Sequence, residues 1–144
     1  MKTLRTIAIL LTVVLSFSTC TKTSVEDDAD KFVGVYSVSV VQNVTWGSNS
    51  GTLTDTGTIM ITKISSNQVQ ISGYFKTQGR VSGNNIYLNS TTENDSSGSI
   101  TTVFGIGIYN GGVITLTGTS SGWLGSNGVQ YTYSSTGRFT AIKQ

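Results

Sequence analysis

Few residues of this 144-residue chain have side chains suited to catalysis or metal binding. The sequence has no histidine, which excludes Ser–His and Cys–His nucleophiles and removes the commonest ligand of zinc, copper and iron. Beyond residue 31 the only carboxylates are Asp55, Glu93 and Asp95, all expected in or near polar loops. Glu93 and Asp95 lack the arrangement of a paired acid and base and the spacing of a calcium-binding loop. We therefore expect no catalytic residue, no metal, no cofactor and no enzymatic activity.

Two tryptophans are the remaining candidates for a binding site. Trp46 and Trp123 both fall in or beside predicted loops, where an aromatic side chain is less needed for a core. If both lie at one end of the fold, they would line a mouth for a sugar or a lipophilic molecule. The alternative is that each closes an end of the fold and binds nothing.

The chain from residue 32 onward has the composition and residue pattern of short β-strands. All 17 glycines lie at or beyond Gly34, there is no proline, and no stretch has a sustained helical period. Tyr36, Val38, Val40, Val44 and Trp46 fall on one face of an extended chain. Asn110-Gly111 indicates a tight hairpin. We predict eight strands, near residues 36–46, 52–64, 69–75, 81, 86–88, 100–109, 113–119 and 129–143, with a bend at Gly137 in the last.

Short hairpin turns throughout favour an all-β, eight-stranded antiparallel up-and-down barrel, with a two-sheet β-sandwich as the alternative. Residues 46–51, 90–99 and 120–128 are expected to be loops by composition. On one face of the sixth strand we expect Ile100, Phe104, Ile106 and Ile108. Eight strands enclose an interior that is either filled by side chains or holds one small ligand.

The first twenty residues read as an export signal. Lys2 and Arg5 precede an apolar run that is too short to span a bilayer, and small and polar residues lead to Cys20, the only cysteine. This segment resembles the lipobox of bacterial lipoproteins, which implies cleavage after residue 19 and lipid attachment at Cys20. Phe17 and Thr19 depart from the commonest residues of that box. The alternative is an ordinary secretory signal in which Cys20 is incidental.

Residues 20–31 have the composition of an acidic flexible linker. They carry four carboxylates and one valine, too little apolar surface to bury. An acidic stretch after the cysteine also resembles the surface-export signal of some Gram-negative lipoproteins. After removal of residues 1–19 the chain has seven basic and seven acidic residues, so its charge favours no nucleic-acid partner.

The opening of the first strand carries a second resemblance. The sequence Phe-Val-Gly-Val-Tyr, residues 32–36, resembles the Gly-x-Trp start of lipocalins and other calycins, with Tyr36 in place of the tryptophan. The resemblance implies that Gly34, Tyr36 and Arg138 close one end of the barrel, with the Arg138 guanidinium across the ring of Tyr36.

These observations predict a signal at residues 1–19, a linker at 20–31 and a barrel domain at 32–144. We expect a lipoprotein of the cell envelope, anchored in the outer membrane through Cys20 and facing the periplasm or the cell surface. The barrel would hold a small apolar or glycan ligand. The alternative is a structural or protein-interaction module whose barrel is filled.

Overall fold

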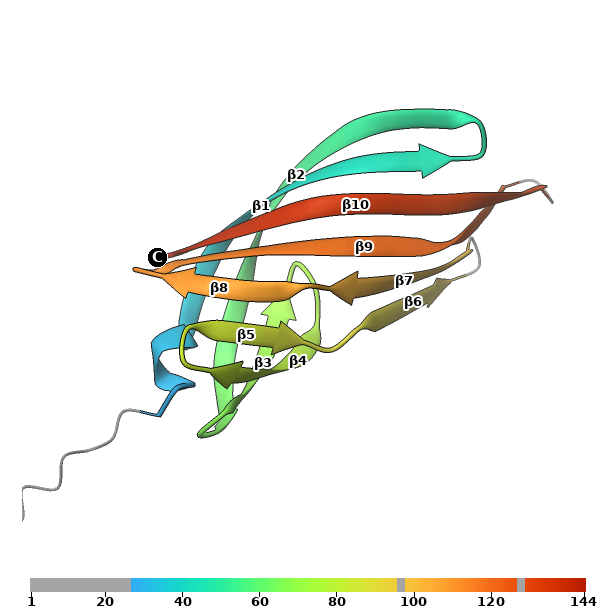
Figure 1. The fold of residues 1–144 in the computed structure, drawn as a ribbon. Coiled ribbons are helices and arrows are strands. Elements are labelled where there is room, and N and C mark those ends of the chain that lie inside the picture. Colours follow the sequence, from blue (N-terminus) through green and yellow to red (C-terminus); the bar gives the residue numbers. More distant parts are fainter. Residues whose placement is uncertain (1–26, 96–97, 127–128) are drawn as a thin grey trace, which may run out of the picture.

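The computed structural model describes residues 27–95, 98–126 and 129–144, and they fold almost entirely as β-structure (Figure 1). Within these ranges a short 3-10 turn, η1 (Asp30–Phe32), precedes ten strands. The strands are β1 (Gly34–Trp46), β2 (Asn49–Ser65), β3 (Gln68–Gly73), β4 (Thr77–Ser82), β5 (Asn85–Leu88), β6 (Thr91–Asp95), β7 (Gly98–Phe104), β8 (Ile106–Asn110), β9 (Val113–Ser126) and β10 (Val129–Lys143).

Eight of these strands close an antiparallel barrel. Hydrogen bonding runs β1-β2-β3-β4-β5-β8-β9-β10, and β10 pairs back with β1 from Tyr36↔Lys143 to Trp46↔Tyr133. Each strand pairs antiparallel with its neighbours, so the predicted eight-stranded barrel is confirmed and the two-sheet sandwich is excluded. Closure leaves no free edge in this part of the sheet.

The β6–β7 hairpin lies where we expected a polar loop. β6 pairs with β7, and β7 pairs with β9 from Gly98↔Leu124 to Phe104↔Gly118. The expectation of loops at residues 90–99 and 120–128 is therefore wrong for most of these residues. Ser and Thr dominate there, and their hydroxyls also pair across strands, as in Thr92 with Thr101 at 2.9 Å. The predicted loop at 46–51 is likewise a tight turn, with β1 ending at Trp46 and β2 beginning at Asn49.

A β-bulge at Gly105 divides the predicted sixth strand into β7 and β8. Three residues separate Phe104 from Ile108, whereas two separate their partners on β9, Gly118 and Thr115. One extra residue reverses the side-chain alternation. Phe104 therefore faces inward while Ile106 and Ile108 face solvent, so the prediction that these side chains share a face is wrong.

The strands differ greatly in length, and this difference shapes the open end. β1, β2, β9 and β10 have 13, 17, 14 and 15 residues, whereas β3, β4 and β5 have 6, 6 and 4. The long strands and the β6–β7 hairpin therefore extend past the barrel as a flared sheet (Figure 1). Across this sheet the strand order is β2-β1-β10-β9-β7-β6.

The closed part of the barrel is filled by aliphatic side chains. Its void measures about 10 Å³, room for about one water molecule. Alternation along each strand sends these side chains inward, and the cross-strand registers bring them together. The central ones are Val38, Val40, Ile59, Ile61, Val69, Ile71, Val81, Ile86, Ile114, Leu116 and Ala141.

Residues 27–33 form a plug at the closed end. Phe32 and Ala29 are fully buried, and the Phe32 ring lies 5.2 Å from that of Tyr109. Asp28 Oδ2 accepts a 2.7 Å hydrogen bond from the backbone N–H of Gly83, in the turn between β4 and β5. The end of the predicted linker is thus held on the barrel, because its carboxylates meet donors that lie far away in the sequence.

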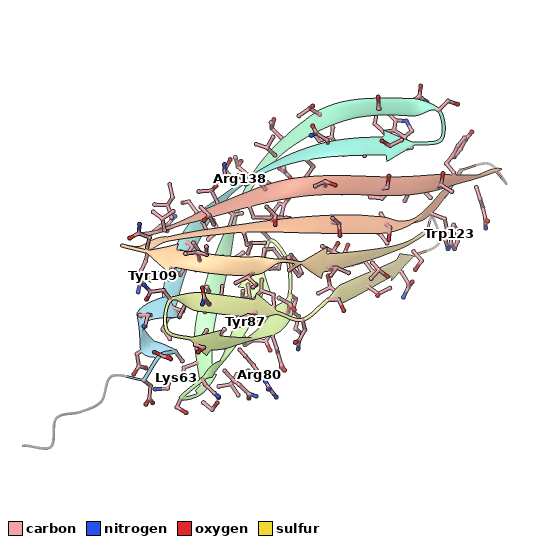
Figure 2. All side chains as sticks on the ribbon, in the orientation of Figure 1. Lys63, Arg80, Tyr87, Tyr109, Trp123 and Arg138 are labelled. Atoms are coloured by element: carbon pink, nitrogen blue, oxygen red, sulfur yellow. The ribbon has the colours of Figure 1, made fainter. Side chains whose placement is uncertain are left out.

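The ammonium of Lys63 adds two ion pairs to the plug. It lies 2.7 Å from Asp27 Oδ2 and 2.8 Å from Asp30 Oδ1. These hydrogen bonds to two carboxylates raise the pKa of Lys63, and partial burial opposes the shift. Figure 2 places Lys63 beside the plug at the foot of the barrel.

Candidate functional site

A half-open trough lies on the inner face of the flared sheet, directly above the filled barrel. Its volume is about 240 Å³, just below the ~300 Å³ at which pockets for drug-sized ligands begin. It therefore has the size for one ring rather than for a long chain. The trough is lined by Gln42, Tyr74, Phe75, Thr91, Glu93, Ile100, Thr102, Phe104, Ser120, Tyr133 and Phe139.

Three phenylalanines form the floor of the trough. Phe75 stacks on Phe104 at 5.2 Å, and Phe139 meets these two rings edge-on at 6.1 and 5.9 Å. Gly118 makes room for this cluster, since a Cβ there would lie 3.2 Å from Phe139 Cε2. Phe75 and Phe139 also line the small void below. The cluster thus separates the filled interior from the trough.

One wall is built from Tyr74, Asp55 and Gly57. β3 ends at Gly73, and the next residue, Tyr74, donates its phenol hydrogen to Asp55 Oδ2 at 2.8 Å. Its ring lies against Gly57 of β2, where a Cβ would be 2.5 Å from Tyr74 Cδ2. Burial and the neighbouring carboxylate raise the pKa of Tyr74 to about 12. At neutral pH Tyr74 is therefore a fixed hydrogen-bond donor.

The rest of the lining carries mainly uncharged polar groups. The hydroxyls of Thr102 and Ser120 lie 2.9 Å apart across β7 and β9. Gln42 Oε1 accepts a 3.2 Å hydrogen bond from Ser135, which leaves the Gln42 amide NH₂ as a donor. Glu93 is the one charged side chain that lines the trough, and none of the described lining residues is basic. The walls suit a neutral or cationic ligand with hydroxyl groups.

The carboxylate of Asp55 is held in place by two hydrogen bonds. Both oxygens of Asp55 accept hydrogen bonds, from the N–H of Thr56 at 2.8 Å and from Tyr74. Asp55 lies within β2, in the region predicted as the second strand, whereas Glu93 lies within β6 and not in the polar loop expected at residues 90–99. Among the described residues no three His, Cys, Asp or Glu side chains gather as metal ligands.

The two predicted tryptophans lie at the same end of the molecule but on opposite faces. Trp46 pairs with Tyr133 on β10 and shares its inward face, whereas Trp123 pairs with Thr132 and Ser99 and faces outward. Figure 2 shows Trp123 near the tip of β9. The structure therefore does not bring the two rings together in one mouth. Trp123 is one residue along β9 from Gly122, which pairs with Tyr133, and neighbouring residues of a strand point to opposite faces.

The predicted barrel-closing group is only partly assembled. Gly34 and Tyr36 do lie at the closed end, where the Tyr36 hydroxyl donates to the carbonyl oxygen of Phe32 at 2.8 Å. Arg138 is exposed and pairs with Val41 on the outward face, so its predicted contact with Tyr36 is wrong. The β10 residue opposite Tyr36 is Lys143, five positions further along the strand. Figure 2 places Arg138 along β10, away from the closed end.

Sequence reasoning missed most of the trough. Gly73 adopts φ +111° and breaks the alternation of the third strand, so the consecutive residues Tyr74 and Phe75 both line the trough. Phe75, Phe104 and Phe139 come from separate parts of the chain, so only strand pairing assembles them. A usable signal existed in the inward-facing glycines such as Gly118, which mark positions where a large side chain from another strand lies close.

Cys20 and the export signal lie outside the described residues, so lipid attachment stays a prediction. The helical part of the described chain contains no segment of the length and hydrophobicity needed to span a bilayer.

Comparison with known proteins gave no relative. Neither a protein-family model, nor a curated protein, nor a solved structure matches the chain.

Proposed function

We propose that the protein is a non-enzymatic binding module that holds one ring of a neutral glycan in the trough. The observation that carries the proposal is the combination of an aromatic floor with walls of hydroxyl and amide groups, one carboxylate and no basic residue among the described lining. The apolar face of a sugar ring packs on Phe104 and Phe75, and its hydroxyls meet Gln42, Ser120 and Tyr74. A few polar groups that converge over an apolar surface are typical of specific small-molecule sites.

The alternative apolar ligand fits less well. The closed barrel keeps only about 10 Å³ free, which does not admit an acyl chain. The carboxylate of Glu93 on the wall of the trough would repel a fatty acid or a phosphate, and no basic group offsets it. A neutral ligand avoids this cost, so charge and volume both favour a sugar over a lipid.

A pair of variants on one strand tests the proposal. Ser120 lines the trough, and its neighbour Thr119 is exposed on the outward face of β9. Binding of a panel of neutral monosaccharides and of dodecanoate to the full chain would be measured by calorimetry. We expect at least one sugar to bind, Ser120→Leu to remove its binding by filling the trough, and Thr119→Leu to leave it unchanged. No sugar binding by the unaltered chain, or equal binding by both variants, would contradict the proposal.

We also propose that this module is a lipoprotein of the outer membrane, attached through Cys20 and facing the periplasm or the cell surface. Six residues separate Cys20 from Asp27, the first described residue, which contacts Lys63 of the barrel. At about 3.5 Å per residue the spacer reaches about 20–25 Å, which keeps the domain close to the membrane. Cys20→Ala should leave the fold intact and release the protein from the envelope fraction. Retention of this variant in the envelope would refute the lipid anchor.

A second candidate function, a protein-interaction module with a filled barrel, is favoured by the outer surface. The bulge at Gly105 turns Ile106 and Ile108 outward, and Ile106 pairs with Tyr87 of β5. Their exposures are 56, 54 and 43%, and Figure 2 shows Tyr87 on this side of the barrel. Replacement of Ile108 by Thr should leave sugar binding unchanged, which separates the two candidates.

A further inference from the structure

From the edge of the trough outward, the inner face of the flared sheet carries a row of three aromatic side chains. Trp46 lies directly opposite Tyr133 across β1 and β10, and Tyr131 is the next inward residue along β10. Tyr133 also lines the trough, so the row begins at the trough and runs toward the tips of the long hairpins. We call Trp46, Tyr131 and Tyr133 the aromatic platform.

Small neighbours leave the rings of Trp46 and Tyr131 partly uncovered. The indole of Trp46 lies over Gly51 of β2, with its Cη2 3.6 Å from the position a Cβ would take there. Tyr131 lies against Gly47, where the corresponding distance to Cδ1 is 3.3 Å. A ring packed on a glycine lies flat along the sheet and presents its other face to solvent.

The exposure of these rings is not needed for the fold. Trp46 and Tyr131 are 37 and 44% exposed, whereas Val44, the next inward residue along β1 toward the barrel, is 2% exposed. Leaving apolar surface in water forgoes the stabilisation that its burial would give. A contiguous exposed aromatic surface beside a pocket is a common mark of a ligand site. The platform is therefore an extension of the site in the trough.

Charge identifies the class of ligand. The inward positions on the flared part of β1, β2, β9 and β10 carry no Lys or Arg, and their polar side chains are hydroxyls, amides and the Asp55 carboxylate. Asn49, opposite Trp46 on β2, supplies one such amide. This surface offers nothing to pair with phosphates, so a nucleic acid or an anionic lipid headgroup is disfavoured. Flat aromatic faces with interspersed hydroxyl and amide groups suit a neutral chain of sugar rings.

We propose that the aromatic platform binds the second and following units of a neutral glycan chain whose terminal unit occupies the trough. The negative face of each ring attracts the weakly positive C–H face of a sugar, as it attracts the edge of another aromatic ring. The inference rests on the proposed function of the trough and deepens it. It specifies an oligosaccharide rather than a free monosaccharide.

The opposite orientations of the two tryptophans give a direct assay. In a Trp123→Phe background of the full chain, Trp46 is the only tryptophan and reports binding by its fluorescence. Neutral β-1,4-linked oligomers of glucose, mannose and N-acetylglucosamine, from monosaccharide to pentasaccharide, would be titrated. In at least one series we expect each added unit up to the third to tighten binding about 3- to 10-fold, followed by a plateau.

Variants of the platform locate the effect of chain length. Trp46→Ala and Tyr131→Ala, each followed by calorimetry, should remove most of the gain from added units and leave monosaccharide affinity within about twofold. The matched control, Trp123→Ala, lies on the outward face and should change neither quantity. If monosaccharides bind but chain length has no effect, or if Trp46→Ala weakens all lengths equally, the platform proposal is overturned and the trough proposal stands. If no oligomer and no monosaccharide binds, both proposals fall.

Discussion

Replacement of Phe32 by alanine tests whether the plug belongs to the folded core of the protein. Phe32 has 0% exposure, its ring packs on Tyr109, and its carbonyl oxygen accepts the hydrogen bond of the Tyr36 hydroxyl. Composition alone places this residue at the boundary between a linker and a domain. The structure instead makes it the side chain that seals the closed end of the barrel.

The expected cost follows from the buried ring. A buried aromatic side chain removes about 150–250 Å² from water, which at about 25 cal/mol/Å² is worth about 4–6 kcal/mol as an upper estimate. Measured Phe→Ala substitutions in cores cost about 3–5 kcal/mol. Because Phe32 is fully buried, we expect Phe32→Ala to cost about 4 kcal/mol, much of the ~5–15 kcal/mol that stabilises a typical domain.

Urea unfolding of the full chain, followed by circular dichroism, measures this loss. We expect a single transition with a much lower midpoint and an unchanged slope, since the plug and the barrel unfold together. Phe32→Leu keeps most of the volume and should cost less than about 1.5 kcal/mol; it also serves if Phe32→Ala does not fold. A loss below about 1 kcal/mol for Phe32→Ala, or a separate early transition, would refute the conclusion that the plug is part of the cooperative core.

Three further predictions concern single groups. Burial and, to a lesser degree, the nearby Tyr109 raise the pKa of Tyr36 from 10.0 to about 12. The contribution of Tyr36 to stability is therefore complete below pH 10 and is lost as the pH rises toward 12. In unfolding measurements between pH 10 and 12, Tyr36→Phe should lose less stability than the unaltered chain, and an equal loss would contradict the assignment. The hydrogen bond from the Gly83 N–H, followed by that from Lys31, lowers the pKa of Asp28 below 3.8. The contribution of Asp28 to stability is therefore present above pH 3.8 and disappears as the pH falls through the lowered value. Asp28→Ala should destabilise the fold more than Asp28→Asn at neutral pH, and equal effects would argue against the hydrogen bond. Gly57→Ala forces the Tyr74 ring to move and should cost about 1–3 kcal/mol while lowering the pKa of Tyr74 from about 12 in a spectroscopic titration; an unchanged titration would show that the ring does not rest on Gly57.

The barrel was predictable because its signals are local. Tyr36, Val38, Val40 and Val44 alternate with polar residues along β1, and the structure buries all four. Such alternation fixes which side chains face inward before any partner strand is known. Turn residues such as Asn110-Gly111 then make consecutive strands neighbours. Period and turns together specify an antiparallel meander, and a meander with one apolar face closes readily.

The register between strands was not predictable from the same signals. The bulge at Gly105 reverses the facing of Ile106 and Ile108, and nothing in the local alternation marks it. The predicted position of Arg138 opposite Tyr36 fails for a similar reason, since the pairing of β1 with β10 puts Lys143 there. A shift by an odd number of residues moves a side chain to the other face. Site predictions that need two distant residues to meet are therefore fragile.

The plug was missed because its energetic partners are remote in sequence. Asp27 and Asp30 meet Lys63, which is more than 30 positions away. A segment rich in carboxylates is expected to stay solvated unless cations and free N–H groups elsewhere in the fold can pair with it. The closed end of the barrel supplies both, together with an apolar opening for Phe32.

Strand length links the filled barrel to the proposed binding site. Where all eight strands are present, the inward side chains meet and leave almost no space. Where β3 and β4 stop, the inward faces of the long strands have no opposite wall, and the same alternation that fills the core leaves aromatic side chains uncovered. Tyr74 and Phe75, in the connection between these short strands, form the boundary between the two regions. The trough therefore needs no change in how the barrel is built. Because β3 and β4 end early, inward side chains that would otherwise belong to the core are left open for binding.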